Sequence, residues 1–255
     1  MRWLGYAIPL SLVPLVMATA VSAASLPEIL ERGRIIVGVK DNLRPLGFVG
    51  ENQELQGLEI DMARQLALEW FGDRDAVEFV PLENVDRLEA VLQGEVDFAI
   101  ANLAETEARS RVVHFSRHYY LSGMGLISKN PDIRGLGDLA YRKIAVLENS
   151  RAIAVIRYEI PHGQLVGVVS YQEAYQKLET GEIDAFAGDR AVLAGWLQEY
   201  PQYRLVDSFL SGEALCVALP KGLQYSGLHL MMNESISRWV QSGWLRDRLE
   251  YWDLQ

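Results

Sequence analysis

The sequence predicts an α/β protein made of two similar lobes that are joined by a two-strand hinge. Helical and strand-like stretches alternate along most of the chain, which is typical of sheets covered by helices. One motif occurs twice, as GEVDFAIAN at 94–102 and as GEIDAFAGD at 181–189. Two copies at this long spacing indicate two related lobes, because a solenoid needs more repeats at shorter spacing. Apolar segments at 123–140 and 213–222 connect the halves.

The first 23 residues have the features of a signal peptide. Arg2 precedes an apolar run, and Val21, Ser22 and Ala23 form a small-residue cleavage site. We therefore expect a mature chain that begins at Ala24 and is periplasmic or otherwise extracytoplasmic. An uncleaved membrane anchor is the alternative, because the apolar run is just long enough to span a bilayer.

The composition is that of an ordinary globular protein. Of 255 residues, 49% are hydrophobic and 23% are charged, and the formal net charge is −10. The first 23 residues carry one Arg and no acidic residue, so their removal changes this charge to −11. Such a charge disfavours nucleic acid and anionic membranes as partners. Cys216 is the only cysteine, which excludes an internal disulfide. We expect no metal and no other cofactor.

The first half of the mature chain reads as alternating helices and strands. Leu58, Met62, Leu66 and Phe71 lie near helical spacing, and Gly72 is a typical stop for that helix. The predicted elements are helix 25–33, strand 34–40, helix 57–72, strand 77–82, helix 84–94 and strand 96–101. This order predicts a mostly parallel sheet covered by helices.

The second half repeats this pattern before a helical tail. Its predicted elements are strand 143–148, helix 150–160, strand 164–169, helix 171–181, strand 183–188 and helix 189–200. The tail at 228–252 is expected to pack back on the first lobe, so the chain crosses between the lobes twice. We therefore expect lobe one to comprise 24–127 and 219–255, and lobe two to comprise 128–218.

The two copies of the repeated motif end in polar residues, Asn102 in one and Asp189 in the other. In open α/β sheets, ligands bind beyond the carboxyl ends of the strands. Each copy is therefore predicted to supply one polar wall of a shared cleft.

Several stretches of the chain resemble the extracellular solute-binding proteins of family 3. The resemblance rests on GLEIDMARQLA, on LQGEVDFAIANLAETEARSRVVHFSRHYY and on LPKG, and it covers nearly the whole mature chain. It implies a periplasmic-binding-protein type II-like fold that closes around a ligand between its lobes. It also implies a monomer that captures a polar amino acid, performs no catalysis and delivers its ligand to the membrane permease of an ABC importer.

The same resemblance implies how an amino acid is bound. Arg109, in the TEAR stretch, matches the ligand of the α-carboxylate, and Asp189 matches the ligand of the ammonium group. Ser150 and Arg151 match a turn whose backbone N–H groups meet the carboxylate. Purely structural roles are the alternatives: a solvated Arg109 on its helix, and capping of the following helices by Asp189 and by Ser150.

Some residues depart from the family pattern around the cleft. Ala104 stands where a Ser or Thr is common, although its backbone N–H is retained, and Leu43 stands where an aromatic lid is common. Glu105 and Arg151 add opposite charges, which either bridge the lobes or mark a changed ligand. With Arg44 as a further cation, an acidic ligand is one possibility.

Two other functions are compatible with the sequence. A dehydratase of this fold that acts on arogenate or prephenate would use a cleft carboxylate, and Glu105 and Glu148 are the candidates. A stand-alone ligand sensor is the second alternative. Fold alone does not decide among these functions.

Overall fold

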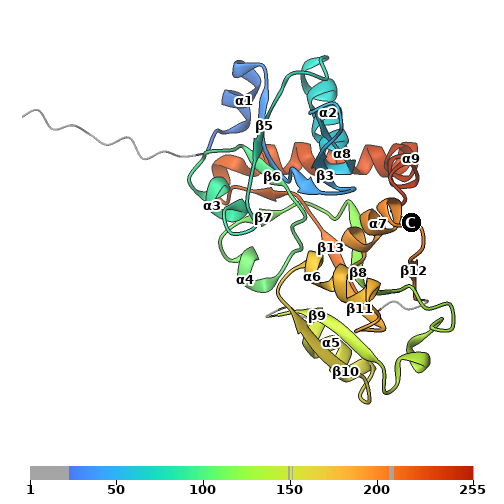
Figure 1. Ribbon diagram of the computed structural model, residues 1–255. Coiled ribbons are helices and arrows are strands. Elements are labelled where there is room, and N and C mark those ends of the chain that lie inside the picture. Colours follow the sequence, from blue (N-terminus) through green and yellow to red (C-terminus); the bar gives the residue numbers. More distant parts are fainter. Residues whose placement is uncertain (1–22, 149, 151, 207–209, 255) are drawn as a thin grey trace, which may run out of the picture.

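The computed structural model describes residues 23–148, 150, 152–206 and 210–254 and has a two-lobed α/β architecture (Figure 1). Lobe one lies in the upper half of Figure 1 and contains both the blue N-terminal elements and the red C-terminal helices. Lobe two lies in the lower half and contains the yellow-green to orange elements. The predicted fold class is therefore confirmed, and the predicted signal peptide falls almost entirely outside the described residues.

Lobe one is built on a five-stranded sheet with the order β5-β1-β6-β14-β7. These strands are β1 (Ile35–Val39), β5 (Val77–Pro81), β6 (Phe98–Ile100), β7 (His114–Phe115) and β14 (Ala218–Leu219). The first three pair in parallel, and β14 is antiparallel to both β6 and β7. A small second sheet, which the sequence did not reveal, contains β2 (Asn42–Leu43), β3 (Gly47–Val49) and β4 (Leu55–Gln56).

Helices cover the sheet of lobe one. They are α1 (Leu26–Arg32), α2 (Leu58–Phe71), α3 (Arg87–Leu92), α4 (Glu107–Ser110), α8 (Ser226–Ser242) and α9 (Trp244–Tyr251), with a short 3₁₀ helix at Leu223–Tyr225. Helix α2 ends at Gly72, whose φ of 76° is the left-handed conformation that glycine adopts without a steric penalty. The tail forms two helices because Gly243 interrupts it in the same way, with φ of 82°. Both tail helices join the core of lobe one, as predicted.

Lobe two is built on a six-stranded sheet with the order β10-β9-β11-β8-β12, in which β13 also pairs with β8. Its strands are β8 (Tyr120–Ser128), β9 (Lys143–Leu147), β10 (Gln164–Val168), β11 (Ala185–Asp189), β12 (Arg204–Leu205) and β13 (Ser211–Leu215). β9 pairs in parallel with β10 and β11, whereas β8 is antiparallel to β11, β12 and β13. Its helices are α5 (Ala152–Glu159), α6 (Tyr171–Glu179) and α7 (Arg190–Glu199), with a 3₁₀ helix at Leu136–Leu139.

The pairing corrects the predicted lobe boundaries at 127/128 and 218/219. All of β8 belongs to the sheet of lobe two, and Ala218 belongs to the sheet of lobe one. The chain therefore crosses near residues 119 and 216. The crossing segments lie side by side, since Tyr119 N–H donates to the Leu215 carbonyl at 3.0 Å and Ser116 N–H donates to the Val217 carbonyl at 3.0 Å.

Helix α7 of lobe two packs directly against lobe one. Ala191 is fully buried in the hydrophobic cluster of lobe one, and a Cβ atom placed on Gly195 would lie 2.3 Å from the Arg44 carbonyl oxygen. The Gln198 amide donates to the Trp252 carbonyl at 3.1 Å. The lobes thus touch along one side of the cleft. Among the described residues, none of the helices has the length and apolar character required to cross a bilayer.

Candidate functional site

The wall of lobe one is the loop that follows β6. Asn102 has a left-handed backbone with φ of 50°, and its backbone N–H donates to Glu59 Oε1 at 2.7 Å. The Arg87 guanidinium donates to the carbonyls of Ala101 and Asn102 at 2.8 and 2.9 Å. The side-chain Oδ1 of Asn102 is buried and accepts no hydrogen bond from the described residues. Such an acceptor is costly to leave unpaired, so it is suited to a donor from a ligand.

Glu59 is fully buried and binds this loop from the interior of lobe one. Its Oε1 also accepts a hydrogen bond from the Tyr119 hydroxyl at 2.5 Å, whereas Oε2 is buried without a partner among the described residues. Burial raises the pKa of Glu59 to about 7, although the hydrogen bonds from Tyr119 and Asn102 and the charge of Arg87 oppose that shift. Glu59 therefore holds the loop in place but cannot touch a ligand.

Arg109 lies half-buried on α4 in the same region. Thr106 caps this short helix, because its hydroxyl accepts from the Arg109 N–H at 3.3 Å. The guanidinium Nη1 of Arg109 donates to the Ala104 carbonyl at 2.8 Å. Its remaining N–H groups have no acceptor among the described residues, and neither does the backbone N–H of Ala104. Lobe one thus presents several donors around Asn102 and Ala104.

The wall of lobe two is centred on Asp189, the last residue of β11. The carboxylate caps α7, since Oδ1 accepts from the Ala191 N–H at 2.8 Å, and it also accepts from the Ser122 hydroxyl at 3.0 Å. The predicted capping role is therefore present. Burial is the main cause that raises the pKa of Asp189 above its ordinary value, and the charge of Glu213 adds to it.

The strand register explains why Glu213 lies near Asp189. On the two sides of β8, Asp189 pairs with Met124 and Glu213 pairs with Ser122. Side chains two residues apart on a strand point to the same face, so all four side chains share one face of the sheet. This face carries the acidic side of the cleft. The charge of Asp189 is also a minor cause that raises the pKa of Glu59 in lobe one.

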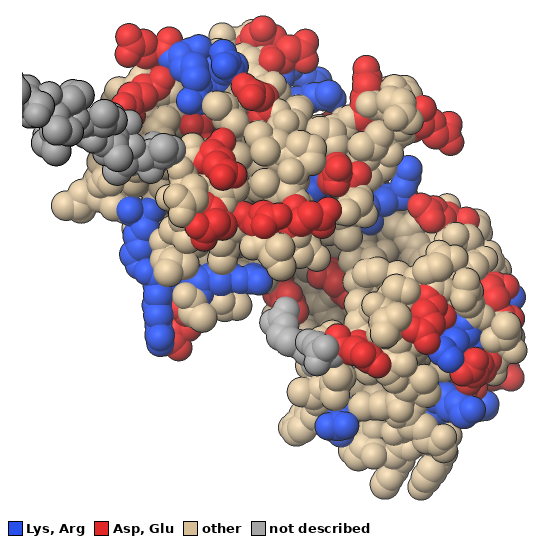
Figure 2. All heavy atoms as spheres, turned by 60° about the vertical axis from the view of Figure 1, so that its left-hand side comes forward, with Lys and Arg blue, Asp and Glu red and all other residues tan. Residues whose placement is uncertain are grey.

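A pocket of about 160 Å³ opens beside Asp189. It is lined by Gly123, Met124, Leu147, Ser150, Ala152, Tyr171, Ala187, Gly188, Asp189 and Glu213. The Ser150 hydroxyl is buried and has no hydrogen-bond partner among the described residues. The structure therefore brings Ser150 and Asp189 together, whereas Arg151 lies outside the described residues. In Figure 2, acidic atoms are visible inside the hollow that separates the two lobes.

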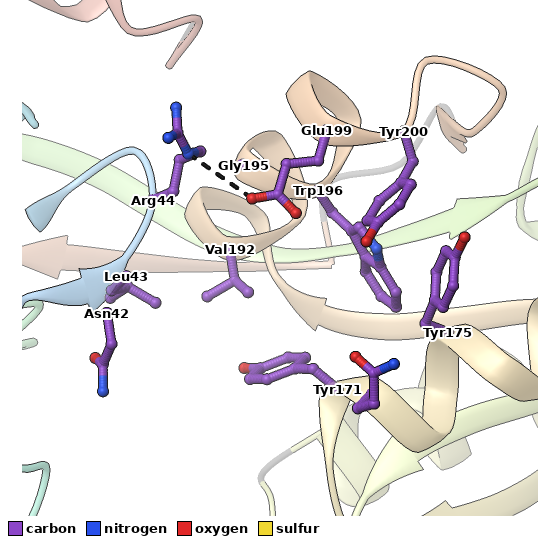
Figure 3. A pocket seen from close by; sticks show the side chains of 11 residues that line it. Asn42, Leu43, Arg44, Tyr171, Tyr175, Val192, Gly195, Trp196, Glu199 and Tyr200 are labelled. Carbon is purple, nitrogen blue, oxygen red and sulfur yellow. Dashed lines mark ion pairs between the residues drawn. The ribbon is translucent and has the colours of Figure 1, made fainter. Parts of the chain in front are cut away.

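Leu43 lies in a second pocket, of about 230 Å³, between β2 and helices α6 and α7 (Figure 3). Arg44 lines the same pocket, where it pairs with Glu199 and lies 3.8 Å from the centre of the Phe48 ring. Arg44 is therefore not an isolated cation, because Glu199 lies beside it. Glu105 is exposed and accepts a hydrogen bond from the Ser110 hydroxyl at 3.1 Å.

Sequence reasoning missed the residues that support this site. The signal for Glu59 was present, because it stands on the same helical face as Met62 and Leu66, and a carboxylate on an apolar face requires buried partners. Arg87 and Tyr171 carried no such signal. Among the described residues, no group of three His, Cys, Asp or Glu side chains is placed to hold a metal ion.

Comparison with known proteins agrees with this architecture. The glutamine-binding protein of Geobacillus stearothermophilus is 31% identical over 198 residues, which cover 76% of each chain. The L-cystine-binding protein of Escherichia coli is 27% identical over 238 residues, which cover 89% of this chain and 85% of that protein. The crystal structure of an ancestral amino acid-binding protein, a precursor of cyclohexadienyl dehydratase, is 26% identical with a TM-score of 0.70, covering 90% of this chain and 99% of that one.

The family match is broader than any of these single likenesses. Residues 35–253 match bacterial extracellular solute-binding proteins, family 3. This range is well over half of the 255 residues. As its motifs predicted, the chain belongs to the bacterial extracellular solute-binding proteins, family 3.

Proposed function

We propose that this protein captures a polar amino acid between its two lobes and delivers it to an ABC importer. The observation that carries the proposal is the division of charge between the two walls of the cleft. Arg109 on lobe one has guanidinium N–H groups that find no acceptor among the described residues, and Asp189 on lobe two is a half-buried carboxylate. An α-amino acid is a zwitterion, so it needs such donors at one end and such an acceptor at the other.

Two buried polar atoms support the same assignment. Asn102 Oδ1 and Ser150 Oγ have no hydrogen-bond partner among the described residues. A buried polar atom without a partner is destabilising, so a ligand that supplies the missing hydrogen bond is favoured. In the proposed complex, Arg109 and the backbone N–H of Ala104 bind the carboxylate together with Ser150. Asp189 binds the ammonium group, and Asn102 accepts a further ligand N–H.

Closure follows from where these groups are located. Arg109 and Asp189 belong to different lobes, so only a closed arrangement satisfies both ends of the ligand. The paired crossing segments near residues 119 and 216 act as the hinge, and they separate lobe one (23–118 and 217–254) from lobe two (120–215). The ligand thereby shifts the equilibrium between open and closed forms, and the permease receives the closed form.

The proposal places the protein outside the cytoplasm, as a monomer released from a signal peptide at residues 1–23. It also treats the protein as a binder without catalysis. Glu59 has a pKa of about 7, which suits proton transfer, but it is fully buried beneath the loop of lobe one. Glu105 is exposed and accepts a hydrogen bond from Ser110, and Glu148, the other candidate from the sequence, is also exposed. None of these three carboxylates therefore has the placement that a dehydratase needs.

A thermal-shift screen of the purified protein tests this function. The ligands are the twenty amino acids, small dicarboxylates, prephenate and arogenate, because a ligand that binds only the folded state raises its stability by about 2.7 kcal/mol at one hundred times its dissociation constant. We expect one group of polar amino acids to raise the unfolding temperature. A shift with prephenate or arogenate accompanied by turnover, or silence from every amino acid, would refute the proposal.

A further inference from the structure

The second pocket adjoins the proposed amino-acid site and is formed by both lobes. It is lined by Asn42, Leu43, Arg44, Tyr171, Gln172, Tyr175, Val192, Gly195, Trp196, Glu199 and Tyr200. The first three residues come from lobe one, and the others come from α6, from α7 and from Tyr200 directly after α7. In Figure 3, Arg44 and Glu199 face each other along one edge, and Tyr171 points toward the side where Leu43 and Val192 lie.

Tyr171 is the wall that the two pockets share. It lines the pocket of Asp189 as well as the second pocket. The Tyr171 side chain is 39% exposed, and its partial burial together with the charge of Asp189 raises the pKa of the phenol to about 12. A ligand whose ammonium group sits at Asp189 can therefore extend past Tyr171 into the second pocket.

The volumes of the two pockets favour one extended ligand. The pockets measure about 160 and 230 Å³, and each is smaller than the roughly 300–1,000 Å³ of typical ligand sites, whereas together they fall within that range. Leu43, Val192 and the Trp196 ring give the second pocket an apolar part, and Asn42, Gln172 and the tyrosine hydroxyls give it uncharged polar groups. Its charged lining residues are Arg44 and Glu199, which face each other along one edge (Figure 3).

That edge holds one charge of each sign, and the two charges come from opposite lobes. Arg44 Nε lies 3.8 Å from Glu199 Oε1, and the side chains are 37% and 55% exposed. An ion pair this long and this exposed contributes little to stability, so a ligand can replace it at small cost. A purely cationic ligand end would pair with Glu199 but be repelled by Arg44, and a purely anionic end would pair with Arg44 but be repelled by Glu199. A group with both charges pairs with both.

We propose that the second pocket receives the far end of the ligand and that this end carries both a carboxylate and an ammonium group. The ligand class is then a diamino dicarboxylic acid, with two amino-acid ends joined by an apolar middle. This inference rests on the function proposed above. Arg109 and Asp189 bind the first end, Tyr171 and Trp196 contact the middle, and Arg44 and Glu199 bind the second end.

Titration calorimetry of the purified protein with matched ligands tests this class. L-cystine and L-cystathionine carry two amino-acid ends, and S-ethyl-L-cysteine retains the thioether but only one end. We expect each two-ended ligand to bind at least about tenfold more tightly than S-ethyl-L-cysteine, the effect of one additional charge-assisted interaction. Equal affinity for the two classes would overturn the inference.

Variants then locate the second end. In Arg44→Gln and in Glu199→Gln, we expect the ratio of the affinity for two-ended ligands to the affinity for S-ethyl-L-cysteine to fall toward one. The matched control is Arg34→Gln with Glu78→Gln, an exposed ion pair of 3.3 Å on lobe one that lines neither pocket, and it should leave the preference unchanged. A preference that survives in both pocket variants would contradict the assignment.

The outcomes separate this inference from the proposed function. If one-ended amino acids bind and two-ended ligands bind no better, only the second subsite is refuted. If no amino acid of either class binds, the proposed function fails and the inference fails with it.

Discussion

The two walls of the cleft begin from nearly the same sequence motif but end in different chemistry. In lobe one, GEVDFAIAN forms β6 and then leaves the sheet as a loop, which Glu59 and Arg87 hold through its backbone. In lobe two, GEIDAFAGD forms β11 and continues directly into α7, so that Asp189 becomes a helix cap. The difference teaches that the repeat determines where each wall lies, whereas the connection after the strand determines the charge that the wall presents.

Removal of the cation of lobe one is expected to have the largest effect. Arg109→Ala should weaken the binding of any amino-acid ligand by about tenfold to a hundredfold or more, because the carboxylate would be desolvated without its partner at a cost of about 1.5–3 kcal/mol or more. Titration calorimetry measures the loss. Arg111→Ala is the control, since Arg111 is exposed and pairs with Glu107 on the surface. Equal affinity in the Arg109 variant and the native protein would show that lobe one binds the ligand differently.

Asp189 has two roles that substitution can separate. Asp189→Asn retains an oxygen that can cap α7, whereas Asp189→Ala removes it. We expect both variants to bind amino acids at least about tenfold more weakly. Only the Ala variant should lose about 1 kcal/mol of unfolding free energy through the lost cap. Calorimetry and chemical denaturation report the two quantities, and near-native binding by the Asn variant would leave capping as the only role of Asp189.

Glu59 predicts how stability depends on pH. Its folded-state pKa of about 7 exceeds its ordinary value of 4.5. Between these values the folded state holds a proton that the unfolded chain has released, so the unfolding free energy contributed by Glu59 falls as pH rises through this window. Glu59→Gln should mimic the protonated form. The unfolding free energy of this variant should therefore decline less between pH 5 and pH 7.5 than that of the native protein. Denaturation of both proteins at pH 5 and at pH 7.5 checks this; parallel declines would contradict the assignment.

Disruption of the contact between α7 and lobe one is expected to have the smallest effect on amino-acid affinity. In Gly195→Ala, the new methyl group would lie 2.3 Å from the Arg44 carbonyl oxygen, so the lobes must move apart locally. We expect amino-acid affinity to fall by a few fold, about 1 kcal/mol or less, because this contact favours the closed form. Gly137→Ala is the control, as no atom lies within 4 Å of its added Cβ. Unchanged affinity in the Gly195 variant would show that closure does not depend on this contact.

Much of the fold was predictable because local sequence patterns determine where its helices and strands form. Most predicted helices and strands differ from the observed ones by one or two residues, and Gly72 ends its helix as expected. The tail was predicted as one helical stretch, but Gly243 divides it into two helices. The lobe boundaries were not predictable in the same way. Strand β8 is apolar and continuous with lobe one in sequence, but its partners are β11, β12 and β13, which come about 60 to 90 residues later in the chain.

The residues at the two walls of the candidate site were predictable from the sequence. The residues that hold those walls in place were not. Asn102 and Asp189 follow from a repeated motif and from the rule that ligands bind beyond strand ends. Arg87 acts through backbone carbonyls that are distant in sequence from its own position. The shared wall at Tyr171 depends on how α6 and α7 meet lobe one, which no local pattern encodes.

The central claim is that opposite lobes bind opposite ends of one amino acid. Titration calorimetry tests it most directly with three ligands: the best amino acid from the screen, its α-methyl ester and its N-acetyl derivative. The ester lacks the carboxylate that Arg109 is proposed to bind, and the acetyl derivative lacks the ammonium group that Asp189 is proposed to bind. We predict that each derivative binds at least about a hundredfold more weakly than the parent amino acid. Retention of the parent affinity by either derivative would contradict the account.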